Sequence, residues 1–299
     1  MAEAQIARPN KTREIQNPMW DSTRWNAVKF RNGDVFIDSF GKSGSHLMRQ
    51  IVAQLIYGGD PDRFGPFLAA RLEMLVSIPL ETILAGIEAN TDRRIFDSHT
   101  PLDALPFDPK VQYLYVARDP RDVIWSAHNH RANFIDPARI AAVKDAPGWD
   151  PDIRAYYLHW LENDDGLGMW QDSYWGHVKA WWNIRHLPNV LLVHFSNLKA
   201  DLKGEIRRIA AFIDVPIEDA TMPAILKHCS LDFMRETASK REGIKRAFRE
   251  GANTLFYKGT NGRWKDVLSA EEIVRCDEIA VERLGRDCAH WLETGELPD

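Results

Sequence analysis

Residues 34–47 of the chain read DVFIDSFGKSGSHL. The run at 34–40 favours a β-strand, and it ends at Gly41-Lys42-Ser43-Gly44. Apolar residues then recur at helical spacing from Leu47 to Ile56, which predicts an amphipathic helix. The stretch therefore predicts a strand, a tight turn and a helix. In open α/β sheets the N–H groups at such a helix start can hold an anion.

The same pattern occurs twice more along the chain. Residues 111–117 (VQYLYVA) read as a strand buried on both faces, followed by Asp119 as N-cap and a helix over about 121–128. Residues 190–195 (VLLVHF) read as another strand, and an amphipathic helix follows over 202–213. Strands alternating with helices predict an α/β fold with a mostly parallel central sheet flanked by helices.

The domain organisation follows from the absence of a linker. No stretch rich in Gly, Pro or Ser divides the chain, so residues 1–299 are expected to form a single domain. Residues 1–33 precede the first strand as an N-terminal extension. Residues 129–176 are less regular and rich in Trp, Tyr, His and Asp, which indicates a lid or pocket wall.

Composition excludes several classes of protein. Apolar residues make up 44% of the 299 residues, enough for a sizeable core. The 38 basic and 43 acidic residues give a net charge of −5, so no overall positive field attracts nucleic acid or a membrane surface. No signal peptide or long apolar span is found, and the three cysteines, Cys229, Cys276 and Cys288, form no CxxC pair. These features predict a soluble protein of the reducing cytoplasm.

The turn at 41–44 only partly matches a Walker A loop. Gly41-Lys42-Ser43 fits the end of that motif, but Phe36 occupies the position of its first glycine, so the loop is too short for a nucleoside triphosphatase. Lys42 supplies a point charge, and the N–H groups of Ser43 to Leu47 are expected to point outward. The alternative is an ordinary turn with a solvated lysine.

Five motifs, in order, resemble those of the cytosolic-type sulfotransferases, which use 3′-phosphoadenosine 5′-phosphosulfate (PAPS) and release 3′-phosphoadenosine 5′-phosphate (PAP). FGKSGSHL (40–47) resembles the family's P-loop-like phosphosulfate-binding loop YPKSGTTW, and SHTPLDALP (98–106) resembles the region of THLP. The others are YVARDPRDVIWS (115–126), beside the 3′-phosphate motif, GHVKAWW (176–182), and YKGTNGRWK (257–265), which is similar to RKGxxGDWK.

The resemblance implies a role for each matching residue. Lys42 would bind the 5′-phosphate and the bridging oxygen, surrounded by loop residues Ser43, Gly44, Ser45, His46 and Leu47. The 3′-phosphate would be held by Arg118, Ser126, Lys258 and Gly259, since a guanidinium and a hydroxyl both donate hydrogen bonds. The adenine pocket would be lined by Phe195, Cys229, Ser230, Leu231 and Met234.

His99 carries the chemistry that the resemblance implies. Its family counterpart is the general base that takes the proton of the acceptor hydroxyl, and the unperturbed pKa of histidine, about 6.5, suits that task. The implied function is transfer of the sulfuryl group from PAPS to a hydroxyl of a small or medium-sized organic acceptor, with a phenol as one option. The alternative for His99 is a hydrogen-bonded core histidine.

The chain departs from the family at three positions. Leu47 replaces the tryptophan that stacks on adenine, Asp97 replaces a lysine, and Tyr257 replaces an arginine. Asp97 is expected either to orient His99 or raise its pKa, or to point to solvent. The basic residues of the segment 241–249 are a candidate replacement for the missing arginine, although a solvated loop is the commoner meaning of such a run; they are Arg241, Lys245, Arg246 and Arg249.

Two other functions remain open at this point. A nucleotide or metabolite kinase is disfavoured by the missing glycine and by the lack of a clear Mg²⁺-holding Asp after a strand. A non-catalytic PAP-binding pseudoenzyme is suggested by the three departures. No metal site is expected, because His128 and His130 lack the spacing and partners of one. The segment 265–272 partly resembles the family's dimer segment, which leaves a homodimer open.

Overall fold

The computed structural model describes residues 8–60, 71–165 and 173–298. Four parallel strands form a sheet with the order β4-β3-β5-β6, which confirms the predicted mostly parallel sheet. The strands are β3 (Val35–Asp38), β4 (Ile95–Ser98), β5 (Gln112–Ala117) and β6 (Val190–His194). A separate antiparallel pair precedes them, β1 (Gln16–Asn17) and β2 (Trp20–Asp21).

Strand alternation divides the interior into two cores. Val35 and Ile37 of β3 belong to one core, while Phe36 between them belongs to the other. Because successive side chains of a strand point to opposite faces, each face of the sheet needs its own cover of helices. This two-sided burial explains the near-continuous apolar runs in the sequence.

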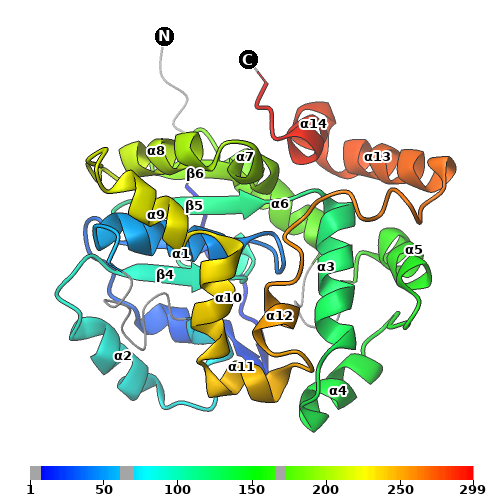
Figure 1. Cartoon of the computed structure of the whole chain (residues 1–299), viewed down its shortest axis with the longest axis horizontal. Helices are drawn as coiled ribbons and strands as arrows, with labels where there is room; N and C mark the ends of the chain where they lie inside the picture. Colours follow the sequence, from blue (N-terminus) through cyan, green and yellow to red (C-terminus); the bar gives the residue numbers. More distant parts are fainter. Residues whose placement is uncertain (1–7, 61–70, 166–172, 299) are drawn as a thin grey trace.

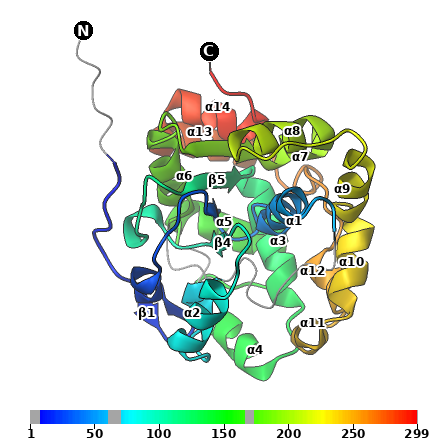
Figure 2. The same ribbon diagram turned by 90° about the vertical axis from the view of Figure 1, so that its left-hand side faces the viewer.

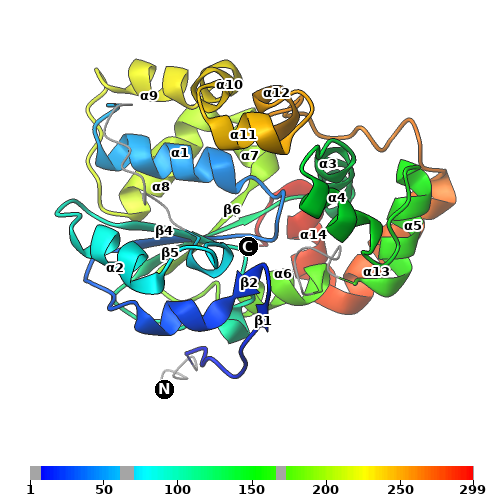
Figure 3. The same ribbon diagram turned by 90° about the horizontal axis from the view of Figure 1, so that it is seen from below.

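Helices cover both faces of the sheet, as Figure 3 shows. One face packs against α1 (Ser45–Ile56), α7 (Phe195–Ala200), α8 (Leu202–Phe212) and α9 (Met222–His228). The opposite face packs against α2 (Leu80–Glu88), α6 (Tyr174–Asn183), α13 (Ala270–Leu284) and α14 (Arg286–Thr294), together with the 3-10 helices η1 (Ser22–Ala27), η2 (Leu72–Met74) and η3 (Leu102–Ala104).

A further group of helices lies beyond the carboxyl ends of the strands (Figure 1). Phe134 and Phe248 form an isolated antiparallel bridge and stack with their ring centroids 5.2 Å apart. This contact joins the segment after α3 to the segment after α11, and Figure 2 shows α4 and α11 at the same edge. The group consists of α3 (Pro120–Ala132), α4 (Pro137–Lys144), α5 (Ile153–Asn163), α10 (Leu231–Ser239), α11 (Glu242–Ala247) and α12 (Ala252–Leu255).

The local predictions are confirmed with small differences in bounds. Asp119 caps α3 by accepting from the N–H of Arg121, and Pro120 is the first helical residue. The helix continues to Ala132, past the predicted end near residue 128. Short α7 was not predicted, because it follows β6 directly and carries no periodic pattern of its own. The single-domain prediction and the lid at 129–176 stay predictions; residues 166–172 lie outside the described part.

Two sequence-based predictions concern the environment of the protein. The three cysteines are all free and buried. Among the described residues, no helix combines the length and the apolar character needed to cross a bilayer.

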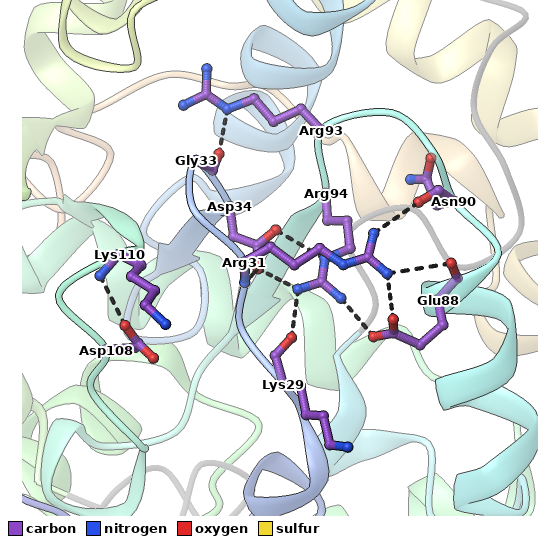
Figure 4. A network of polar contacts seen from close by, with 10 residues as sticks. All are labelled: Lys29, Arg31, Gly33, Asp34, Glu88, Asn90, Arg93, Arg94, Asp108 and Lys110. Atoms are coloured by element: carbon purple, nitrogen blue, oxygen red, sulfur yellow. Dashed lines mark hydrogen bonds and ion pairs between the residues drawn. The ribbon is translucent and has the colours of Figure 1, made fainter.

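A buried ion pair fixes the start of the sheet (Figure 4). Arg94 is 2% exposed and donates to both carboxylate oxygens of Asp34, at 2.9 and 2.5 Å. It also donates to the carbonyl of Lys29 at 2.8 Å and to Glu88 at 2.8 Å. Asp34 in turn accepts from the N–H of Arg31 at 2.7 Å. The network connects the segments entering β3 and β4 with the end of α2.

Replacing Asp34 by Ala should lower the free energy of unfolding by about 3–5 kcal/mol, because it leaves the Arg94 guanidinium buried without its carboxylate. The matched control is Asp219→Ala, which removes an 89% exposed carboxylate from Arg207 and should cost less than about 1 kcal/mol. Urea denaturation measures both values. Equal costs for the two variants would contradict the structural role given to Asp34.

Candidate anion-binding and catalytic site

The turn between β3 and α1 has a conformation that few residues adopt. Gly44, the N-cap of α1, has φ +123°, and an added Cβ would lie 2.6 Å from Cδ2 of Phe195. Lys42 has φ +73°, in the left-handed region that costs a non-glycine residue roughly 1 kcal/mol or more. Within the described part of the chain, the N–H groups of Gly44, Ser45 and His46 have no hydrogen-bond acceptor. The turn therefore presents free donors, as an anion site requires.

Two of the loop N–H groups expected to point outward are already occupied. The N–H of Ser43 donates to the carbonyl of Phe40 at 3.2 Å, and that of Leu47 donates to Gly44 at 3.1 Å. The expectation that both N–H groups face an anion is therefore wrong, because the turn closes on itself at each end. The side chain of Ser43 is buried, and its Oγ has no hydrogen-bond partner in the described structure.

A cavity of about 480 Å³ opens in front of this turn, beyond the carboxyl ends of the strands. It collects residues expected at the site from six separate parts of the chain, and all of the expected residues except Ser43 line it. Those lining residues are Lys42, Gly44, Ser45, His46, Leu47, His99, Arg118, Ser126, Phe195, Cys229, Ser230, Leu231, Met234, Lys258 and Gly259.

The charge of the cavity lining is one-sided. No Asp or Glu lines the cavity in the described part of the chain, although the whole chain has a net charge of −5. Lysine and arginine side chains line it instead. A concave site whose charges all have the same sign attracts a ligand of the opposite charge. They are Lys42, Arg71, Arg118, Arg139, Lys199, Lys258 and Arg263.

The pKa of Lys42 shows the effect of burial among other cations. Its burial, together with the nearby charges of Arg118, Arg71 and Arg263, lowers the pKa of Lys42 to about 7. Its Nζ lies 3.2 Å from Nδ1 of His130, a neutral acceptor when the other ring nitrogen carries the hydrogen. A bound anion would favour the charged form of Lys42 again.

Arg118 lies at the end of β5, where the sequence places it. Its Nη2 donates to the carbonyl of Thr260 at 3.0 Å and to Oδ1 of Asn261 at 2.8 Å, and its guanidinium lies 4.5 Å from the centroid of Phe195. The N–H of Gly262 donates to Asp122 of α3 at 2.8 Å. These contacts hold the segment 257–263 against the start of α3, so both sequence motifs meet at one wall of the cavity.

Arg263 is a cavity residue that the sequence analysis missed. Its guanidinium lies 5.4 Å from the ring of Tyr257, and Lys258 lies at the same distance. None of the basic residues of the segment 241–249 lines the cavity, so the expectation that this segment replaces the family arginine is wrong. The signal was present in GRWK, where the family motif has an aspartate and this chain has Arg263.

His99 directly follows β4, and its ring orientation is fixed. Nδ1 lies 2.6 Å from the carbonyl oxygen of Ser39, which can only accept, so Nδ1 carries the hydrogen and Nε2 is the basic nitrogen. The backbone N–H of His99 donates to the buried Glu73 at 3.1 Å. Burial, followed by the charge of Arg71, lowers the pKa of His99 well below 6.5 and keeps the ring neutral.

Asp97 does not act on His99 as the sequence analysis expected. Its side chain is fully buried rather than solvated, and its Oδ2 accepts from Nε of Arg71 at 2.8 Å. Arg49 lies 3.5 Å from the same oxygen. The expected rise in the pKa of His99 is therefore wrong, because these guanidinium groups neutralise Asp97. Arg71 was not predicted from the sequence, because it belongs to no recognised motif.

The histidines considered for a metal site have other partners. His128 Nε2 lies 3.1 Å from the carbonyl of Asp150, and His130 contacts Lys42. The part of the chain that the structure describes contains no group of three or more His, Cys, Asp or Glu side chains that could hold a metal ion.

Known proteins are similar to this chain in sequence. The family model described as a sulfotransferase domain matches residues 32–287. The glycolipid sulfotransferase of Mycobacterium bovis is 28% identical and covers 93% of each chain, and sulfotransferase 1A1 of Rattus norvegicus is 27% identical, covering 88% of this chain and 87% of that protein.

Solved structures show the same architecture. Mouse sulfotransferase SULT7A1 complexed with PAP has a TM-score of 0.68 at 21% identity, covering 92% of this chain and 93% of that chain. Retinol dehydratase in complex with androsterone and PAP has a TM-score of 0.66 at 20% identity, covering 88% and 83%. These likenesses support the fold, while the family model spans most of the sequence. The chain belongs to the sulfotransferase family.

Proposed function

We propose that this protein transfers the sulfuryl group of PAPS to a hydroxyl group of a small or medium-sized organic acceptor. The observation that carries the proposal is a cavity lined by cations and no described carboxylate, with a neutral, oriented histidine in the same lining. Cations suit a cofactor with phosphate groups at two positions, and the histidine suits proton removal from a hydroxyl.

The residues present fit the two phosphate regions of PAPS. The free N–H groups of the turn and Lys42 would hold the 5′-phosphate, because these N–H groups have no hydrogen-bond acceptor within the described structure. Arg118, Ser126 and Lys258 would hold the 3′-phosphate at the wall formed by α3 and the segment 257–263. The other cavity residues on α7 and α10 are largely apolar and would contact the adenine.

Bound PAPS supplies the sulfuryl group: the acceptor oxygen bonds to sulfur, the bond from sulfur to the 5′-phosphate oxygen breaks, and PAP leaves. His99 takes the proton of the acceptor hydroxyl on Nε2, because the contact with the Ser39 carbonyl keeps the ring hydrogen on Nδ1. Lys42 stabilises the negative charge that develops on the leaving phosphate. The positions of these two residues in one cavity provide the proximity that such a transfer needs.

The two rival functions predict different ligands. A kinase needs a carboxylate to hold Mg²⁺ near the phosphates, and no described carboxylate lines the cavity. Thermal shift with PAP, ATP and GTP separates the kinase from the proposed function, with the largest stabilisation expected from PAP. Transfer of labelled sulfate from PAPS to a panel of phenols, alcohols and glycolipid hydroxyls separates an enzyme from a pseudoenzyme.

Two smaller points stay predictions. The five motifs of this chain resemble those of the cytosolic-type sulfotransferases, and the chain is similar to sulfotransferase 1A1 of two rodents, which supports a cytoplasmic location. A homodimer through the segment 265–272 is supported by the partial resemblance of that segment to the family's dimer segment.

Replacing Arg118 by Ala should weaken PAP binding by roughly 1.5–3 kcal/mol, the loss expected for a charge-assisted hydrogen bond. Isothermal titration calorimetry measures the affinity. The matched control is Arg207→Ala, which removes an exposed guanidinium outside the cavity and should leave the affinity unchanged. Equal affinities of wild type and Arg118→Ala would exclude Arg118 from the 3′-phosphate site.

PAP binding at pH 8 should take up protons. Lys42 is mostly neutral at that pH in the free protein, because its pKa is about 7, and a bound phosphate raises the pKa again. Calorimetry in two buffers with different heats of ionisation measures the uptake. Lys42→Met should abolish the difference between the buffers, whereas wild type without any difference would contradict the assignment.

His99→Asn should lower kcat at least about a hundredfold while retaining PAP binding, since general-base catalysis contributes on that scale. In wild type the acid limb of the kcat/KM profile for PAPS, which reports the free enzyme, should lie below pH 6.5, because a lowered pKa keeps His99 neutral until the pH falls well below that value. The profile is measured with saturating acceptor and with PAPS well below its KM. An acid limb above pH 6.5, or near wild-type turnover in the variant, would rule out a neutral His99 as the base.

A further inference from the structure

Asp97 and two arginines form a buried charge cluster beside the cavity, here called the Asp97 cluster. Asp97 is fully buried, and Arg71 and Arg49 both approach its Oδ2, at 2.8 and 3.5 Å. Its Oδ1 has no hydrogen-bond partner in the described structure. Two guanidinium groups share one carboxylate, so the Asp97 cluster has an excess of one positive charge when all three groups are ionised.

Only one member of the Asp97 cluster lines the cavity. Arg71 is among the lining residues, together with Lys42 and His99, whereas Asp97 and Arg49 are not. Nη2 of Arg71 donates to Oγ of Ser45 at 2.7 Å. Ser45 is the first residue of α1, directly after the turn with free N–H groups. The excess charge is therefore presented at the start of α1, where the phosphosulfate of PAPS is proposed to bind.

The charge of Arg71 affects the groups on both sides of the reaction. It contributes, after burial, to the lowered pKa of Lys42, on the leaving-group side. It also contributes to the lowered pKa of His99, on the acceptor side. Arg71 lines the same cavity as both groups, between which the transferred sulfuryl group must pass.

We propose that Arg71, held in place by Asp97 and Ser45, binds the sulfuryl group as a second cation beside Lys42. The inference rests on the proposed function and adds a catalytic residue to it. Arg71 belongs to none of the five sequence motifs. Asp97 becomes a positioning residue, which gives a physical meaning to the acidic residue two positions before His99.

A guanidinium fixed at two points suits this role. The Nε of Arg71 is held by Asp97 and its Nη2 by Ser45, so little reorganisation is needed when negative charge shifts during transfer. A sulfuryl group passing through a loose transition state depends mainly on positioning and on such fixed charges. One cation is enough to neutralise the charge of Asp97, and Arg49 already supplies it. The positive charge of Arg71 is therefore available for a ligand.

The test compares Arg71→Gln with Arg49→Gln. Both variants remove one guanidinium from the same carboxylate oxygen, but Arg71→Gln also removes the donor to Ser45, and only Arg71 lines the cavity. Arg71→Gln should lower kcat with the best acceptor of the panel at least about a hundredfold, while Arg49→Gln should stay within about threefold of wild type. Thermal melting of both variants shows whether they fold equally well.

Binding supplies a second readout that needs no turnover. Without acceptor, Arg71→Gln should weaken PAPS at least about fivefold and leave PAP within about threefold of wild type, because PAP lacks the sulfuryl group. Equal losses for PAP and PAPS, or equal losses of kcat in the two variants, would assign Arg71 a structural role and overturn the inference.

A variant that fails to fold does not end the test. The double variant Arg71→Gln/Asp97→Asn removes the buried carboxylate charge together with its partner, and it should show the same selective loss for PAPS. Wild-type turnover in the double variant would overturn the inference. Failure of the wild-type protein to bind PAP would instead overturn the proposed function, so the two failures are distinguishable.

Discussion

The close contact between Gly44 and Phe195 is the constraint on which the site depends. Gly44 begins α1 after β3, and Phe195 begins α7 after β6, so the contact joins the starts of two helices that follow different strands. A Cβ at Gly44 would lie 2.6 Å from the Phe195 ring. The same ring supports the guanidinium of Arg118. Because Gly44 has no side chain, Phe195 can pack against the turn, and this contact fixes the position of the free N–H groups relative to Arg118.

Like charges gathered in the cavity lining lower the stability of the ligand-free protein and favour the binding of an anion. Burial first, and then repulsion from the neighbouring cations Arg118, Arg71 and Arg263, lowers the pKa of Lys42. The rest of the fold behaves differently: Arg94 and Arg121 are buried too, but each is paired with an aspartate. Arg71 is a cavity cation that is likewise paired with an aspartate, but the cavity lining has several further cations and no described carboxylate, which is the pattern expected of a functional site for an anion.

The sequence predicted the features that depend on local pattern. Buried strands, the cap at Asp119 and the turn at Lys42–Gly44 follow from composition and spacing within a few residues. Arg71 and Arg263 could not be predicted in the same way, because their positions depend on how segments without periodicity fold over the strand ends. Asp97 was misread for a related reason: alternation places it on a face of the sheet, but its ion partners come from elsewhere in the chain.

The motif at 176–182 does not line the cavity, but it contacts the end of β3, which adjoins the site. Trp181 of α6 donates from Nε1 to the buried Asp38 at 2.9 Å, and Asp38 accepts from the N–H of Ser39 at 2.8 Å. The carbonyl of Ser39 accepts from Nδ1 of His99. A helix that does not line the cavity therefore helps to fix the end of β3, and the end of β3 fixes the tautomer of His99. The orientation of the proposed base is thus determined from the opposite face of the sheet, where the large aromatic core leaves little freedom to move.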